Sequence, residues 1–142
     1  MIVPDVNLLV YAYNSDAPFH EQAKAWWKGL MNGCHDVGLP WVVSLGFLRL
    51  MTNPRVLIQP LTATEAMSHV NSWFERLQVS ILQPGPRHLQ ILQSFADRQL
   101  LVSNLVTDAH LAALAIENGA ELHSNDADFT RFPGLRHRNP IV

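Results

Sequence analysis

The chain has 142 residues, 48% of them hydrophobic and 15% charged, a composition typical of a globular protein that excludes a disordered chain. Its net charge of −2, with histidines neutral, excludes a strongly basic nucleic-acid footprint. Cys34 is the only cysteine, which excludes an internal disulfide and a cysteine-based zinc site and fits a cytoplasmic location. We find no signal peptide, membrane-spanning stretch, repeat or linker, so we predict a single domain over residues 1–142 and no membrane attachment.

The first part of the chain alternates short apolar runs with helical patterns. The predicted elements are a strand at 2–7, helices at 8–13 and 20–31, a strand at 37–40 and an apolar helix at 41–51. Trp26 and Trp27 are adjacent in the second helix and therefore point about 100° apart. We expect one of them to lie off the core face, so that this helix forms one wall of a groove for an amphipathic partner helix.

The second part of the chain continues this alternation. The predicted elements are a helix from about 63 to 77, a strand at 79–82, helices at 87–101 and 107–118, a strand at 120–124 and an edge strand in the tail, 136–142. Thr62 and Glu65 form a capping box for the first of these helices. Leu77 and Leu89 are among the positions expected to face the core. Strands alternating with helices predict an α/β fold, a three-layer αβα sandwich around a mostly parallel sheet of four or five strands.

Four aspartates fall where such a fold collects ligands. Asp5 ends the first strand, Asp108 lies in the first turn of a helix, and Asp126 and Asp128 follow a late strand. Parallel strands end at one edge of the sheet, where crossover helices also begin, so the four side chains are expected to meet there. Crowded carboxylates repel each other unless a cation lies between them, and Mg²⁺ or Mn²⁺ held by such groups supports phosphodiester hydrolysis.

Each aspartate also has a purely structural reading. Asp5 could begin a turn or cap the following helix, and Asp108 could simply favour the positive end of a helix dipole. Asp126 and Asp128 could be turn formers. Taken together, the purely structural interpretations are less convincing, because they require three distant segments to place carboxylates at one edge of the sheet by coincidence.

These residues carry a resemblance to a known family. Asp5-Val6-Asn7, residues 107–115 and residues 124–129 resemble the acidic motifs of PIN-domain ribonucleases. The segments that resemble one branch of that family, the VapC toxins of bacterial type II toxin–antitoxin pairs, are 39–41, 46–49, 52–55 and 131–135. The similarity spans nearly the whole chain, and the ordered combination is more specific than any single piece.

The resemblance implies a Mg²⁺- or Mn²⁺-dependent endoribonuclease that cuts structured RNA such as tRNA or rRNA. It also implies neutralisation by a cognate VapB antitoxin, and a homodimer. By position, Asp5 and Asp108 match the principal metal ligands, Asp126 the third acid, and Asp128 a further acid acting through water. The sequence departs from the family where many PIN domains carry a Glu, because Leu45 and Gly46 occupy that place. The number of metal ions therefore stays open, and Gly46 is expected to leave room for substrate or water.

Further candidates surround these acids. Contacts with substrate or with metal ligands are expected from Asn7, Ser44, Arg49 and Thr107. Arg49 could instead pair with a structural carboxylate, and Ser44 and Thr107 could bond only to the backbone of their helices. Two other functions remain open, a non-catalytic PIN-fold binding module and a receiver-like domain with an aspartate phosphoacceptor. A receiver would require a lysine on a late strand, whereas Lys24 and Lys28 are the only lysines.

Overall fold

A computed structural model describes all 142 residues and contains one five-stranded sheet. The strand order is β3-β2-β1-β4-β5, and every neighbouring pair is parallel. The strands are β1 (Ile2–Pro4), β2 (Val37–Pro40), β3 (Val79–Leu82), β4 (Glu121–His123) and β5 (Arg136–Arg138). The predicted α/β sandwich is confirmed, and the tail does form the expected edge strand.

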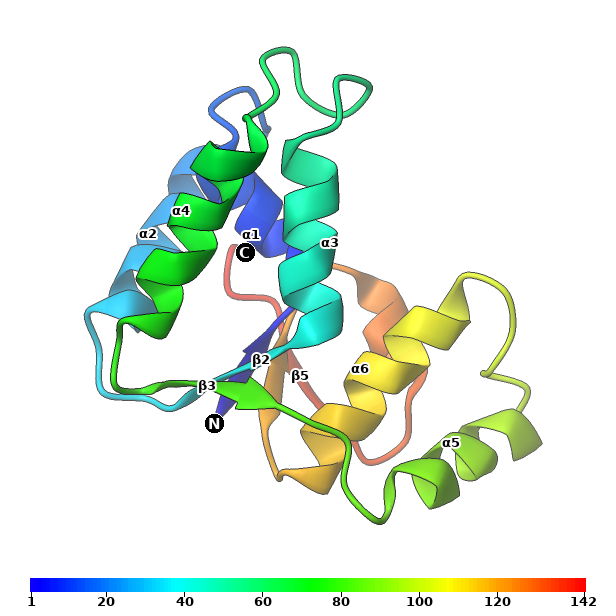
Figure 1. The fold of residues 1–142 in the computed structure, drawn as a ribbon. Helices are drawn as coiled ribbons and strands as arrows, with labels where there is room; N and C mark the ends of the chain where they lie inside the picture. The colour runs from blue at the N-terminus through cyan, green and yellow to red at the C-terminus, as the bar shows by residue number, and fades with distance from the viewer.

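Helices cover the sheet in two groups, one on either side of the strands (Figure 1). In the first group α1 packs against α2 and α3, and α3 packs against α4, while α5 and α6 pack together in the second. The helices are α1 (Val6–Tyr13), α2 (His20–Met31), α3 (Trp41–Met51), α4 (Ala63–Phe74), α5 (His88–Asp97) and α6 (Leu105–Glu117), with a short 3₁₀ helix, η1 (Ala127–Arg131). None of the helices combines the length and hydrophobicity needed to cross a membrane.

The apolar faces of both helical layers meet the sheet in one continuous core. Its largest fully buried side chains include Trp73, Phe47 and Phe95. The predictions for Leu77 and Leu89 are wrong, because both side chains are exposed. Helix α4 already ends at Phe74, so Leu77 lies beyond it, and α5 turns His88 and Phe95 inward instead of Leu89.

One local signal in the sequence acts as expected, and one element boundary differs from the prediction. Thr62 caps α4, since its hydroxyl accepts a hydrogen bond from Glu65 N at 3.1 Å and the Glu65 carboxylate accepts one from Thr62 N at 3.1 Å. At the first strand, β1 ends at Pro4 and α1 begins at Val6, two residues earlier than predicted. Asp5 is thus the single residue between strand and helix, and it lies at the carboxyl edge of the central strand.

Candidate active site

Asp5 is held at this edge by contacts with the neighbouring strand. Its backbone N–H donates to the His123 carbonyl at 2.9 Å, and its Oδ2 accepts a hydrogen bond from the Ser124 hydroxyl at 2.7 Å. The side chain is only 7% exposed, and this burial raises the pKa of its carboxyl, although the hydrogen bond from Ser124 acts in the opposite direction. Asp5 does not cap α1 through its side chain, so the capping alternative is not observed.

Ser124 is a site residue that the sequence reasoning did not single out. Pro4 is paired with His123 in the parallel register of β1 and β4, so the residues that follow them, Asp5 and Ser124, face each other. The Ser124 hydroxyl is fully buried and also accepts a hydrogen bond from Asp126 N at 3.0 Å. It therefore connects Asp5 to the acidic loop. The register of two strands distant in sequence was the missing signal.

The acidic loop after β4 keeps the turn chemistry expected of its residues. Asp126 caps η1, because its Oδ1 accepts a hydrogen bond from Asp128 N at 2.9 Å. Asp126 is thus a turn former, as its structural interpretation predicted. Only Oδ1 takes part in the cap, so the other carboxylate oxygen is free to bind an ion. Asp126 is half-buried beside the site, whereas Asp128 is exposed one position into η1.

Asp108 approaches from the other helical layer, in the first turn of α6. Its pKa is raised from 3.8 to about 6, first by burial and then by the negative charges of Asp5, Asp126 and Asp128. The four predicted carboxylates are therefore close enough to oppose each other's ionisation. No lysine or arginine forms an ion pair with any of them.

Helix α6 is also connected to α5 through a partly buried chain of polar side chains. Glu117 Oε1 lies 2.8 Å from His88 Nδ1, and His88 Nε2 lies 2.9 Å from His110 Nδ1. With Glu117 ionised, His88 donates to the carboxylate and accepts from His110. His110 therefore packs α6 against α5, and the contact holds the helix that carries Asp108.

The carboxylates surround a small cavity of about 120 Å³. Its lining consists of Asp5, Val6, Asn7, Val42, Val43, Thr107, Asp108, Leu111 and Asp126. Asn7 and Thr107 are exposed at its rim, and neither side chain forms a hydrogen bond within the protein, so both can serve a substrate or a hydrated ion. Asp128 stands outside the lining and acts on the cavity only through its charge.

The donor set suits a hard divalent cation. Three carboxylates, one amide and one hydroxyl offer oxygen ligands of the type that Mg²⁺ and Mn²⁺ prefer, and no positive side chain offsets the charge. As the side chains stand, no three of them converge closely enough to share an ion. Carboxylates without a cation between them repel each other, which disfavours such convergence. In chemical type the site fits the metal, with its side chains spread apart.

Helix α3 contributes differently from what the sequence suggested. Ser44 is buried away from the cavity and its hydroxyl has no hydrogen-bond partner, so neither of its two predicted roles is observed. Arg49 lies exposed on α3, outside the cavity lining, and forms no ion pair with a structural carboxylate.

The room expected beside Gly46 is not there, because a Cβ at this position would lie 3.2 Å from Val6 Cγ2. Gly46 instead allows α3 to pack closely against the start of α1, next to Asp5. The side chain of Leu45 is 58% exposed. Helix α3 contains no aspartate or glutamate, so it brings no acid to the cavity.

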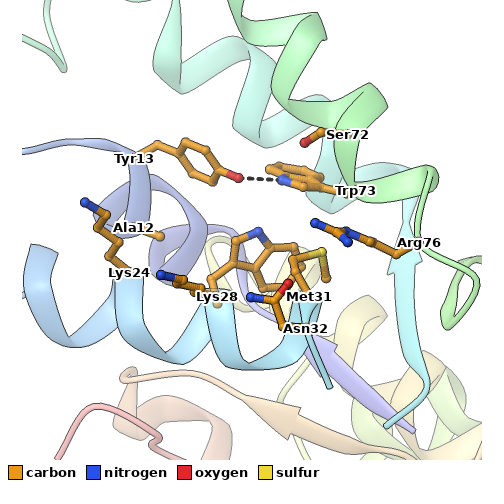
Figure 2. Close-up of a pocket in the computed structure, with 10 residues that line it drawn as sticks. Ala12, Tyr13, Lys24, Lys28, Met31, Asn32, Ser72, Trp73 and Arg76 are labelled. Carbon is orange, nitrogen blue, oxygen red and sulfur yellow. Dashed lines mark hydrogen bonds between the residues drawn. The ribbon is translucent and has the colours of Figure 1, made fainter. Parts of the chain in front are cut away.

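A larger cavity of about 400 Å³ lies elsewhere, between α1, α2 and α4 (Figure 2). Its lining includes Lys24, Lys28 and Arg76 but no acidic residue, and none of these three cations forms an ion pair. Across it, Trp73 Nε1 donates to the Tyr13 hydroxyl at 2.8 Å. Although larger, this cavity contains none of the acidic candidates, so we place the chemistry at the smaller one.

The two adjacent tryptophans of α2 differ in burial, but their rings pack against each other with centroids 5.5 Å apart, and Trp26 also packs against the hydrophobic core. The expectation that one of them lies off the core face is therefore wrong. Trp27 is buried, lines the larger cavity and packs edge-on against Trp73, with an interplanar angle of 81°. Trp26 is half-buried, and its indole N–H donates to His123 Nδ1 at 3.0 Å. On α2, Trp27, Lys24 and Lys28 line the larger cavity, whereas Trp26 is hydrogen-bonded to His123 at the end of β4; the groove for a partner helix stays a prediction.

Comparison with known proteins agrees with the fold. Residues 2–135 match the PIN domain family, and the chain belongs to that family. Its full-length relatives are VapC ribonucleases. Ribonuclease VapC33 of Mycobacterium tuberculosis is 43% identical over 141 residues, 99% of each chain, and Ribonuclease VapC37 of the same species is 37% identical over 140 residues, 99% of this chain and 97% of the relative.

Solved structures show the same fold at low sequence identity. VapBC2 from Rickettsia felis, bound to a promoter DNA fragment, aligns with a TM-score of 0.68 and 18% identity over 98% of both chains. Mycobacterium tuberculosis VapC20, described as a toxin that cleaves the sarcin–ricin loop, aligns with a TM-score of 0.65 and 18% identity over 96% of this chain and 99% of the other. The PIN family resemblance of the sequence is thus confirmed, and the receiver-like and non-catalytic alternatives are not favoured.

Proposed function

We propose that residues 1–142 form a single-domain endoribonuclease toxin that hydrolyses phosphodiester bonds of structured RNA, tRNA or rRNA, with Mg²⁺ or Mn²⁺ at the carboxylate cavity. One observation carries the proposal. Asp5, Asp108 and Asp126 come from three distant segments and line one cavity, without a positive side chain to balance them. Such an arrangement costs folding free energy, which a bound cation would recover. A cytoplasmic location follows from this choice of substrate.

The residues divide the work by position. Asp5, buried and oriented by Ser124, is a fixed ligand, and Asp108 and Asp126 complete the ligand set from α6 and from the loop after β4. When bound, the ion would supply Lewis-acid assistance to the attack of water on phosphorus. Asn7 and Thr107 at the rim are free to hydrogen-bond a phosphate oxygen, and Asp128 can orient a water beside the cavity. The number of ions remains open, since α3 provides no fourth acid at the usual place.

The test measures metal binding and RNA cleavage separately. Mn²⁺ binding by calorimetry and 5′-end sequencing of RNA after brief exposure are compared for the unmodified protein, Asp5→Asn, Asp108→Asn and a control, Asp16→Asn, whose carboxylate is exposed elsewhere. The first two variants should lose both activities, and the control should keep both. Chelation with EDTA should stop cleavage, and Mg²⁺ or Mn²⁺ should restore it. Undiminished cutting by Asp5→Asn, or cutting indifferent to EDTA, contradicts the proposal.

We further propose that a VapB-type antitoxin neutralises the protein and that the protein forms a homodimer. The VapBC2 structure of similar fold is a pair of such partners. In this chain the larger cavity between α1, α2 and α4 supports a partner that carries acidic side chains. Lys24, Lys28 and Arg76 stand there without counter-ions around a hydrophobic floor that includes Trp27 and Met31. An amphipathic acidic helix matches both features.

A further inference from the structure

A hydrogen-bonded row of three side chains lies behind the candidate active site and contributes nothing to the lining of its cavity. At its centre is His123, the last residue of β4, whose side chain is only 5% exposed. His123 Nδ1 accepts a hydrogen bond from the Trp26 indole N–H at 3.0 Å, and His123 Nε2 lies 2.7 Å from Glu121 Oε1. Both ring nitrogens are therefore engaged, one with helix α2 and the other with β4 itself.

The chemistry of the two partners fixes the state of the His123 ring. An indole N–H can only donate, so His123 Nδ1 is the acceptor and carries no proton. The proton of the neutral ring is then on Nε2, which donates to the Glu121 carboxylate. A ring turned over by 180° would present carbon atoms to both partners. Trp26 and Glu121 together therefore allow the His123 side chain one orientation.

The end of β4 also holds the carboxylates of the candidate active site. The His123 carbonyl accepts a hydrogen bond from Asp5 N at 2.9 Å, and the hydroxyl of the next residue, Ser124, donates to Asp5 Oδ2 at 2.7 Å. The Ser124 hydroxyl also accepts a hydrogen bond from Asp126 N at 3.0 Å. A shift of this strand end would therefore move the hydrogen-bond partners of two of the three aspartates that line the cavity.

The other contacts of this strand end lie within the sheet. Ser124 N donates to the Arg138 carbonyl at 3.0 Å, and His137 Nε2 donates to the Ser124 carbonyl at 2.9 Å. Both partners belong to the edge strand β5. The bond from Trp26 is the only hydrogen bond that joins the end of β4 to a helix. It therefore fixes this strand end in a direction that its bonds to neighbouring strands do not control.

We propose that Trp26 and His123 are positioning residues of the candidate active site. By fixing the end of β4, they keep the Ser124 hydroxyl on Asp5 in the orientation that binds the cation. The inference rests on the proposed metal-dependent function and adds to it two residues that lie outside the cavity lining. Replacing a residue that orients a metal ligand through hydrogen bonds typically weakens metal binding about 10- to 100-fold. Trp26 and His123 act one step farther from the ion, so we expect the lower end of that range.

A role in stability alone would have a different consequence. The Trp26 ring packs against Trp27 and against the hydrophobic core, so removing the whole side chain would also disturb packing. Trp26→Phe keeps an aromatic ring at this place and removes the N–H donor. A variant that is only less stable unfolds at a lower temperature, but once folded it binds the metal with unchanged affinity. Metal affinity measured well below the unfolding temperature therefore separates positioning from stability.

The test measures Mn²⁺ binding to the metal-free protein by calorimetry at neutral pH. Trp26→Phe and His123→Leu should each raise the Kd for Mn²⁺ about 10-fold. His123→Gln supplies one acceptor and one donor from its amide and should recover most of the affinity. Thr62→Ala is the matched control, because it removes the capping box of α4 and should lower stability without changing the Kd. Thermal unfolding of every variant shows that each is folded at the temperature of the measurement.

Cleavage of a mixture of tRNA and rRNA gives a second readout. The Mn²⁺ concentration for half-maximal cleavage should rise by the same factor in Trp26→Phe, and the rate at saturating Mn²⁺ should stay unchanged. An unchanged Kd for Trp26→Phe overturns the inference, even where His123→Leu fails to fold. A Kd for Thr62→Ala that rises as much as that for Trp26→Phe also overturns it. If the unmodified protein binds no Mn²⁺, the proposed function itself fails and the inference with it, which is a separate result.

Discussion

Replacing Asp108 with Asn should stabilise the metal-free protein although it abolishes metal binding. The raised pKa of Asp108, about 6 against an ordinary 3.8, means that the fold opposes its ionisation, because burial and three neighbouring carboxylates disfavour the charge. The difference corresponds to about 3 kcal/mol. Since the side chain is only half-buried, solvent screening reduces this to about 1 to 2 kcal/mol.

One effect acts against this gain. Asp108 lies in the first turn of α6, where a negative charge interacts favourably with the helix dipole by about 0.3 to 1 kcal/mol. The carboxylate forms no hydrogen bond that Asn would lose. A net stabilisation of about 1 kcal/mol therefore remains, which corresponds to a rise in Tm of about 4 °C for a chain of this size.

The assay is thermal unfolding at neutral pH, first in EDTA and then with Mg²⁺ or Mn²⁺. The unmodified protein should unfold at a higher temperature with the metal, since a ligand that binds only the folded state stabilises it. Asp108→Asn should start higher in EDTA and respond little to the metal. The control variant Asp16→Asn should match the unmodified protein in both conditions.

The stabilisation should also depend on pH, and its sign can be worked out. Above about pH 6 Asp108 is charged in the folded and unfolded states, so the full penalty is present. Between about pH 6 and 3.8 the folded protein binds the proton first, so the penalty fades as pH falls, and it is absent below that range. The gain from Asp108→Asn should therefore be largest at pH 7 and vanish near pH 4. A lower Tm for Asp108→Asn in EDTA at pH 7, or a gain that grows on acidification, refutes the reasoning.

Three other changes test separate parts of the structure. Thr62→Ala removes the capping box of α4 and should lower the free energy of unfolding in urea by about 1 kcal/mol without affecting cleavage. Gly46→Glu should not improve metal binding. It should lower the free energy of unfolding by about 1 to 3 kcal/mol, because the new side chain clashes with Val6. Adding Val6→Ala should restore part of that free energy. Reversing charge at the larger cavity, with Lys28→Glu and Arg76→Glu together, should leave RNA cleavage intact and weaken inhibition by the antitoxin, and unchanged inhibition would remove that cavity as the partner site.

Local patterns in the sequence were sufficient for most of the fold. Hydrophobic periodicity placed every strand, and the Thr62–Glu65 pair marked the start of α4 correctly. The alternation of strands with helices predicted a parallel sheet, and that topology brought Asp5, Asp108 and Asp126 to one edge. These features depend on neighbours in the chain or on the general rule that parallel strands end together. Errors such as Leu77 and Leu89 occurred where the end or rotation of a helix is set by what it packs against.

The tertiary structure alone decided which side chains contact each other across the sheet. The bond from Ser124 to Asp5 depends on the register of β1 with β4, and the filling of the space at Gly46 depends on how closely α3 approaches α1. The exposure of Trp41, rather than of the tryptophans in α2 and α4, likewise depends on which helix faces find a partner. The sequence by itself determined the acidic residues and the edge at which they gather, because periodicity and parallel topology are local or general properties. Packing between distant segments determined their hydrogen bonds and their pKa values.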